Sequence, residues 1–395
     1  MPHFARVGEF PRKRHTVFRQ PDGSLYWEEL IGEDGFVGDT SLVYHRNPPT
    51  ALTAIEPIPV AGEELVPNHP ITPLHLQPRL LSLKGDAVLD RSTLVGNDDV
   101  RIAYAVATET STLYKNSVGD ELAYVESGHG TLESTFGRLD VSEGDHVIVP
   151  TSTIHRWVVP DGVELRLLIV QATGHIDPPS RYLSARGQFL EGTPYCELDI
   201  RRPEELVFDE GTDVPVVVRT RTGLTRHVHR HHPFDVVGWH GGMYPWAFSI
   251  FDFEPITGRL HQPPPTQQTF EARGFVMCAF VPRLLDYHPD AVPIPPSHSN
   301  VDSDEFLFYA KGAANTRRGS GVGIGSVTVH PAGFIHGPHP GTVERALGAD
   351  RIDEYQVMLD THRPLMISAA ARSVLDGDYP FSWAAMEEKE IKTDA

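Results

Sequence analysis

The chain has 395 residues, 40% of them apolar and 22% charged, which is ordinary for a globular protein and long enough for two β domains or one duplicated domain. Its 53 acidic residues outnumber its 34 lysines and arginines and give a net charge of −19, which argues against nucleic acid as a partner because phosphate contacts need a basic surface. With two cysteines, no signal-peptide core and no apolar run of membrane-spanning length, we expect a cytoplasmic protein with neither a disulfide framework nor a membrane partner.

Short strands are the main elements predicted along the chain. Thirty-four glycines and 34 prolines interrupt runs rich in Val, Ile, Phe and Tyr, a pattern typical of many short strands. Alternation of side-chain character predicts strands at residues 121–125, 146–149, 163–170 and 275–281. Helical character is expected only around residues 363–375. A Pro-containing stretch near residue 178 predicts a division into residues 1–178 and residues 179–395.

The two halves carry the same pattern of spaced residues, which indicates a duplication. The first copy consists of Tyr114, Asn116, Glu121 and Gly128, followed by Gly144, Pro150, Ser152 and His155. The second copy consists of His298, Asn300, Glu305 and Gly312, followed by Gly325, Pro331, Gly333 and His336. The Asn–Glu–Gly offsets and the Gly–Pro–His spacing are identical in the two copies, but Tyr114 stands where the second copy has His298. The pattern therefore predicts that one metal site was kept and the other was lost.

The second copy supplies three candidate metal ligands. His298 and Glu305 are seven residues apart, so on one straight strand they would face opposite ways. Because the intervening residues are turn-rich, we expect His298 to end one strand and Glu305 to begin the next, with His336 arriving from a later hairpin. Two imidazoles and a carboxylate with open positions suit non-heme Fe(II), although hydrolytic zinc sites use the same ligands. The first copy, with Glu121 and His155 alone, is expected to be a structural barrel.

These spacings resemble the two motifs of the cupin superfamily, whose members are jelly-roll β-barrels. The stretch from Gly325 to His336 resembles the second cupin motif, and His298 with Asn300 takes the place of two motif histidines. The resemblance implies an all-β, duplicated cupin architecture with extra N-terminal strands and few short helices. Residues 1–178 would hold a degenerate, structural barrel, and residues 179–395 would hold the metal-binding catalytic barrel.

A narrower resemblance, to homogentisate 1,2-dioxygenases, rests on several segments spread over most of the chain. They are His232-Pro-Phe-Asp-Val-Val-Gly-Trp-His-Gly-Gly242, Tyr244-Pro-Trp246, Phe280-Val-Pro-Arg283, the Gly-Pro pair after His336, and Pro11-Arg-Lys-Arg-His15. The resemblance implies Fe(II) as the cofactor. It implies conversion of homogentisate and O2 to 4-maleylacetoacetate in tyrosine and phenylalanine catabolism, by a homo-oligomer such as a trimer or hexamer. The roles implied are Fe(II) ligation by His298, Glu305 and His336, acid–base catalysis by His240, and substrate contact by Asn300, His330 and Tyr309.

Departures from that family keep other functions open. The first His and the Glu are one residue further apart than in the animal enzymes, and Ala313-Ala314-Asn315 stands where those enzymes carry a substrate-pocket Tyr. A dioxygenase for a related hydroquinone or gentisate-like acid is therefore an alternative. A non-oxidative metal cupin, such as an isomerase, and a non-enzymatic bicupin are further alternatives. The histidine cluster at residues 227–232 is interpreted as a solvated strand and loop, since arginines alternate with its histidines.

Overall fold

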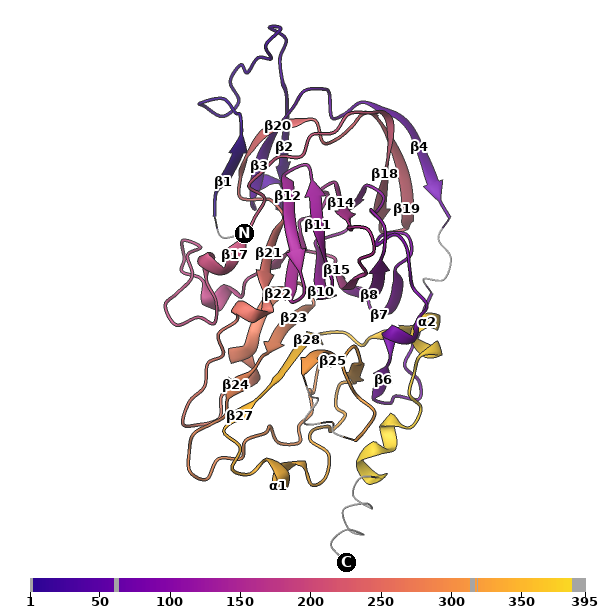
Figure 1. Cartoon of the computed structure of the whole chain (residues 1–395), viewed down its shortest axis with the longest axis vertical. Helices are drawn as coiled ribbons and strands as arrows, with labels where there is room; N and C mark the ends of the chain where they lie inside the picture. The colour runs from indigo at the N-terminus through magenta and orange to yellow at the C-terminus, as the bar shows by residue number, and fades with distance from the viewer. Residues whose placement is uncertain (1–2, 60–63, 313–316, 318, 386–395) are drawn as a thin grey trace, which may run out of the picture. The chain divides into compact units, whose positions relative to one another are not determined.

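The computed structural model describes residues 3–59, 64–312, 317 and 319–385, and it divides the chain into two compact units. Unit 1 comprises Met1–Ala61, Leu83–Arg91 and Tyr104–Ser249. Unit 2 comprises Gly62–Ser82, Ser92–Ala103 and Ile250–Ala395. The all-β prediction is confirmed, since nearly all regular elements are strands (Figure 1). The predicted boundary at residue 178 does not coincide with this division, because unit 1 continues to Ser249.

Unit 1 contains three sheets. A four-stranded sheet has the order β1 (Ala5–Gly8), β20 (Val236–Gly241), β3 (Thr40–His45), β2 (Trp27–Gly32). A seven-stranded sheet has the order β12 (Gly137–Ser142), β11 (His129–Ser134), β14 (His155–Val158), β9 (Tyr114–Asn116), β18 (Thr212–Thr220), β19 (Gly223–His231), β4 (Leu52–Ile58). The third has the order β17 (Ile200–Arg201), β21 (Trp246–Ser249), β13 (Asp145–Val149), β10 (Glu121–Ser127), β15 (Leu165–Ala172), then the end of β8 (Val100–Ala107).

The core of unit 1 forms where these sheets bury both of their faces. Every residue of β13 is buried, and so are six of the seven residues of β10, including the polar Glu121, Asp145 and His146. Trp157, Trp239 and Trp246 are among the largest fully buried side chains. Trp239 donates its indole N–H to the Phe136 carbonyl oxygen at 2.7 Å, so its one polar group is satisfied inside this core.

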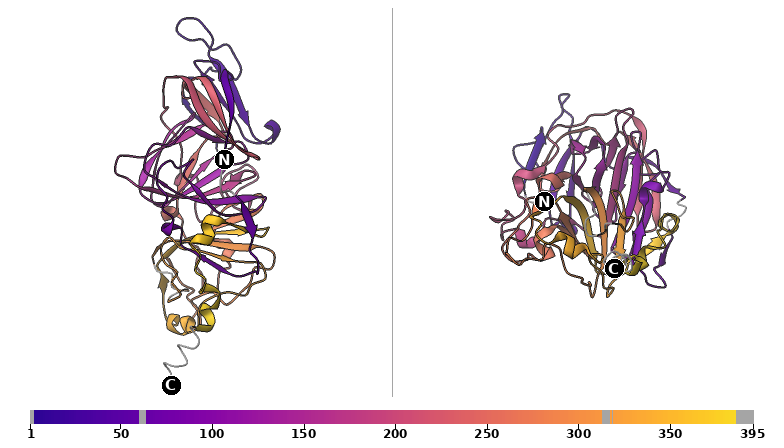
Figure 2. Two further views of the ribbon diagram at one scale, coloured as in Figure 1. Left: turned by 90° about the vertical axis from the view of Figure 1, so that its right-hand side faces the viewer. Right: turned by 60° about the horizontal axis from the view of Figure 1, so that its bottom comes forward.

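Unit 2 is built on one main sheet, whose orange and yellow strands lie side by side in Figure 2. Its order is β22 (Gln268–Ala272), β23 (Phe275–Phe280), β28 (Glu354–Thr361), β25 (Asp304–Gly312), β26 (Val327–His330), β6 (Leu74–Leu76). Smaller pairings join β24 (Arg283–Leu284) to β27 (Arg351–Ile352), and β29 (Met366–Ser368) to both β7 (Ser92–Gly96) and β5 (Leu65–Pro67). The central position of β25 places Glu305, the one carboxylate among the three candidate ligands, within the sheet.

Helices are few and short, as expected from the sequence. Those with both ends in the described ranges are α1 (Thr342–Ala346), α2 (Ala369–Ser373) and the 3-10 turns Asp34–Phe36, Pro78–Leu80, Ser180–Tyr182, Glu197–Asp199, Ile250–Asp252, Pro264–Gln267 and Tyr379–Phe381. The helix expected within residues 363–375 is α2, which begins only after β29. Within the described ranges, no helix has the length and apolar character of a membrane span.

Candidate metal centre

Three of the predicted site residues converge in unit 2. The ligand atoms of His298, Glu305 and His336 all lie within 4.8 Å of one another. Nε2 of His336 is 3.4 Å from Oε1 of Glu305, and Nε2 of His298 is 3.9 Å from Oε2 of Glu305. We call these three residues the metal group. The geometry that the spacing predicted, two imidazoles facing one carboxylate, is therefore present.

Local backbone structure brings the metal group together. His298 and His336 exchange two backbone hydrogen bonds, each N–H donating to the other's carbonyl oxygen at 2.8 Å. A corner of the chain is formed at Gly333, whose φ of 74° favours glycine and whose N–H donates to the Asn300 carbonyl oxygen at 2.6 Å. The Asp304 carboxylate fixes the start of β25 by accepting the backbone N–H groups of Ala332 and Leu365 at 2.8 and 2.7 Å.

The hydrogen bonds of the metal group fit a divalent metal ion. Nδ1 of His298 donates to the Pro296 carbonyl oxygen at 2.9 Å, and Nδ1 of His336 donates to the Phe334 carbonyl oxygen at 3.0 Å. Such bonds fix the tautomer in which each Nε2 carries a lone pair, as carbonyl oxygens bonded to the other ring nitrogen of metal-binding histidines do. Nε2 of His336 is buried and has no hydrogen-bond partner among the described residues. A metal ion would satisfy that buried nitrogen.

The carboxylate of Glu305 is ionised in this environment. Burial alone would raise its pKa, but the three neighbouring imidazoles of His298, His330 and His336 outweigh burial and hold the pKa well below its ordinary value. His330, predicted to contact substrate, instead donates from Nδ1 to Oε1 of Glu305 at 2.9 Å and accepts from the Tyr379 hydroxyl at 2.9 Å. Burial lowers the pKa of His330 to about 4, so the ring is neutral at physiological pH. His330 is fully buried and orients the Glu305 carboxylate.

The metal group opens on a cavity of about 190 Å³ whose lining residues all belong to unit 2. His298, Glu305 and Asn300 line it, and Asn300 donates from Nδ2 to Oδ1 of Asp360, a further lining residue, at 2.7 Å. Burial and the Glu305 charge raise the pKa of Asp360 to about 7. The predicted contact residue Tyr309 packs instead in a buried cluster with Cys278, Leu307 and Met358, and it is not among the lining residues. Ala313-Ala314-Asn315 lie outside the described residues.

Besides Asp360, two polar cavity residues were missed by the sequence analysis. Arg317 is only 4% exposed, donates to the Gly337 carbonyl oxygen and lies 5.4 Å over the Trp383 ring. Its Nε is buried without a partner, and no carboxylate of the described residues pairs with it within 4 Å. His261 also lines the cavity, and its Nδ1 is 3.3 Å from Oδ2 of Asp286, an arrangement that leaves Nε2 free. Neither residue lies in a recognisable motif, so no sequence signal pointed to it.

His240, expected to be the acid–base residue, lies on β20 in unit 1. Its Nε2 is 3.2 Å from the Tyr44 hydroxyl, and the rings of Phe4 and Phe10 lie 5.7 and 5.6 Å away. Burial and the Arg14 charge lower its pKa, so the imidazole is neutral. His240 is not among the residues that line the metal-group cavity.

In the first copy, an arginine binds the carboxylate at the position equivalent to Glu305. Tyr114 pairs with His155, as His298 pairs with His336 in the second copy, and Nδ1 of His155 likewise donates to the carbonyl oxygen two residues earlier, at 3.0 Å. Nη1 of Arg91 donates to both oxygens of Glu121, at 3.0 and 3.1 Å. Burial would raise the pKa of Glu121, but the Arg91 guanidinium outweighs it and the pKa is lowered. In unit 1 the buried carboxylate thus has a guanidinium as its cation.

Comparisons with known proteins find one family model, several similar sequences and structures of related fold. A family model described as "Homogentisate 1,2-dioxygenase N-terminal" matches residues 98–250. A Saccharolobus solfataricus protein named "Putative dioxygenase SSO1533" is 38% identical over 97% of this chain and 99% of its own length. Homogentisate 1,2-dioxygenase of Bradyrhizobium diazoefficiens is 24% identical over 70% of this chain and 63% of its own length. Among solved structures, a cupin 2 conserved barrel domain protein from Leptotrichia buccalis is 11% identical with a TM-score of 0.34, covering 77% of this chain and 100% of that one.

Proposed function

The chain belongs to the homogentisate dioxygenase family, and we propose that it is a non-heme Fe(II) dioxygenase that converts homogentisate and O2 to 4-maleylacetoacetate. The observation that carries the proposal is the metal group of His298, Glu305 and His336 at the wall of a cavity. These three side chains would hold the ion. Fe(II) held in this way would supply open coordination positions for the substrate and for dioxygen.

Arg317 supports an anionic substrate. The net charge of −19 repels anions at long range, so an arylacetate needs a local cation in addition to the metal ion. A buried guanidinium without a carboxylate partner is suited to a substrate carboxylate, which it can bind through two parallel hydrogen bonds. We assign Arg317 to the carboxylate of the substrate side chain.

Replacing Arg317 by Gln should raise KM for homogentisate at least ten-fold with little change in kcat, because a hydrogen bond to a charged group contributes about 1.5–3 kcal/mol. The measurement is steady-state oxygen uptake. Methylhydroquinone, which lacks the carboxylate, is the control substrate and should be turned over equally by both proteins. Because Arg317 contacts the residue after His336, iron content must be equal in both proteins. An equal loss on the two substrates would show that Arg317 does not bind the carboxylate.

The proton of the ring hydroxyl needs an acceptor, and His261 and His240 are the two candidates. His261 lines the cavity, with Asp286 orienting its Nδ1, whereas His240 carries the role implied by family resemblance. We assign the role to His261. His261→Gln should lower kcat by about 10²–10⁴-fold, the usual contribution of a general base, with iron content unchanged. His240→Gln is the matched comparison, and loss of turnover in that variant alone would transfer the role to His240.

The proposed function as a whole is tested by metal analysis and oxygen uptake. Purified protein should contain iron, and anaerobically iron-loaded protein should consume oxygen with homogentisate. Gentisate in the same assay tests the alternative of a related hydroquinone acid. Zinc without oxygen uptake would favour the non-oxidative cupin, and protein that binds no metal would favour the non-enzymatic bicupin.

A further inference from the structure

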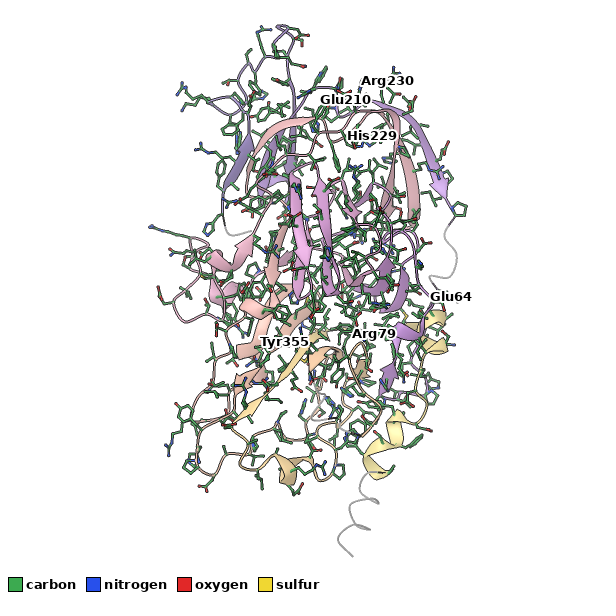
Figure 3. The ribbon with its side chains drawn as sticks, viewed as in Figure 1. Glu64, Arg79, Glu210, His229, Arg230 and Tyr355 are labelled. Atoms are coloured by element: carbon green, nitrogen blue, oxygen red, sulfur yellow. The ribbon has the colours of Figure 1, made fainter. Side chains whose placement is uncertain are left out.

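A second cavity, of about 80 Å³, lies entirely within unit 1 and shares no lining residue with the metal group. We call it the polar cavity. Its walls include polar side chains of β2, β3, β9 and β19 and of two turns, namely Glu29, His45, Lys115, Thr135, Ser152 and His229. His229 can be found on β19 next to Arg230 in Figure 3. The expectation of a solvated histidine cluster is wrong for His229 and His232, which are 9% and 7% exposed and line this cavity.

The acidic groups of the polar cavity already have partners. His45 bridges two carboxylates, with Nδ1 2.7 Å from Oδ1 of Asp235 and Nε2 3.0 Å from Oε2 of Glu29. Burial would lower the pKa of His45, but the hydrogen bonds to Asp235 and Glu29 outweigh it and raise the pKa to about 9. Oδ2 of Asp235 accepts both the backbone and the side-chain N–H of Asn47 at 2.8 and 2.9 Å. Glu29 and Asp235 are thus held by an imidazolium.

Lys115, by contrast, is not held by a hydrogen bond or an ion pair to any described residue. Its neighbours Tyr114 and Asn116 are buried on the opposite face of β9, and in the described part of the chain its ammonium makes no hydrogen bond or ion pair. Burial lowers its pKa, and the Glu29 carboxylate offsets only part of that shift. Two further lining residues, Thr135 and His229, each have a buried polar atom with no partner among the described residues. Such groups are uncommon in folded proteins unless a ligand or water completes them.

The backbone conformation of Ser152 is unusual for a residue other than glycine. Its φ is 66°, in the left-handed region, at the position where the second copy has Gly333 with φ 74°. Glycine would adopt this backbone without strain, whereas a side chain there is unfavourable. Non-glycine residues in such conformations persist where the surroundings require them, often at ligand sites. Here the residue is a hydroxyl-bearing serine on the wall of the polar cavity.

We propose that the polar cavity binds a small oxyanion, such as inorganic phosphate or a short carboxylate. The Lys115 ammonium supplies the charge, and the hydroxyls of Thr135 and Ser152 and the imidazole of His229 supply hydrogen bonds. A volume of about 80 Å³ limits the ligand to a few heavy atoms. The site is independent of the proposed dioxygenase activity.

The test is isothermal titration of the full-length protein with phosphate and, separately, with acetate. Wild type should bind at least one of them at a single site, and Lys115→Gln should weaken that binding roughly ten-fold or more, since charge-assisted hydrogen bonds are the strong ones. Lys84→Gln, which removes an exposed lysine of the same unit, is the matched control and should bind as wild type does. Thr135→Val tests the hydroxyl without removing charge, and it should weaken binding less than Lys115→Gln does.

Binding must also persist in a protein that lacks the metal group. His336→Ala should bind the oxyanion with unchanged affinity, because that residue lies in unit 2. Loss of binding in His336→Ala would show that the anion binds at the metal centre and would overturn the proposal. So would equal affinity in Lys115→Gln and wild type, or the absence of saturable binding of both anions to wild type.

Discussion

His336→Ala is expected to fold but to retain no stoichiometric iron and to consume no oxygen with homogentisate. Removing one of three protein ligands leaves His298 and Glu305, too few to hold a labile divalent ion in an open site. His336 is also only 3% exposed, so bulk solvent does not supply a ligand in place of its imidazole nitrogen. Iron content of the purified protein, measured after dialysis, gives the primary result, and oxygen uptake gives the second.

His155→Ala is the matched control for this prediction. His155 occupies the same position in the first copy, is equally buried, and makes the same Nδ1 bond to the carbonyl oxygen two residues earlier. It should therefore lose a comparable amount of packing while keeping full iron content. If both variants lost iron equally, the loss would reflect unfolding. Full iron in His336→Ala would mean that the metal group is wrongly assigned.

The metal group could be predicted from the sequence because its determinants are local. Turn residues between His298 and Glu305, and the corner at Gly333, fix the backbone over short distances, and duplication reveals the spacing twice. Tyr114 of the first copy takes the place of His298 in the structure as well, because Tyr114 pairs with His155 as His298 pairs with His336. Side-chain alternation along β25 puts Leu307 on the cavity side together with Glu305.

The rest of the site depends on pairing between distant strands, which spacing does not encode. Asp360 reaches the cavity because β28 pairs with β25, directly opposite Glu305. Tyr309 lies on the same face of β25 as Glu305, four residues further along the strand. It packs in a buried cluster and does not line the cavity. Arg91 precedes Glu121 by 30 residues and belongs to no motif, so its approach to the first copy could not be foreseen.

The boundary between the units shows the same limitation. Pro-containing sequence near residue 178 is a reasonable linker signal, yet residues beyond it return to unit 1. β18 adds to β9 in parallel, β21 pairs with β13, and β20 lies between β1 and β3. These pairings cover strand edges that would otherwise be exposed. Strands after residue 178 therefore join unit 1, although a linker-like segment separates them from it in the sequence.

Arg91→Met is expected to lower the free energy of unfolding by about 3–5 kcal/mol, because it leaves the Glu121 carboxylate charged and buried without its cation. Both side chains are less than 10% exposed, at 8% and 2%, so solvent cannot replace the guanidinium. The double variant Arg91→Met/Glu121→Leu removes both charges and should recover most of the loss. Arg226→Met, which breaks an exposed pair with Glu56, is the matched control and should have little effect.

The pH dependence of Arg91→Met distinguishes a lost ion pair from lost packing. In wild type the pKa of Glu121 is lowered from 4.5, so its stabilising contribution is present above that pH and is lost as pH falls through the folded-state value. Without Arg91, burial raises the pKa of Glu121, and the carboxyl becomes protonated as pH falls toward its ordinary range. The stability deficit of Arg91→Met relative to wild type should therefore be largest at neutral pH and shrink on acidification. Thermal unfolding followed at several pH values would measure it, and a deficit independent of pH would assign the effect to packing alone.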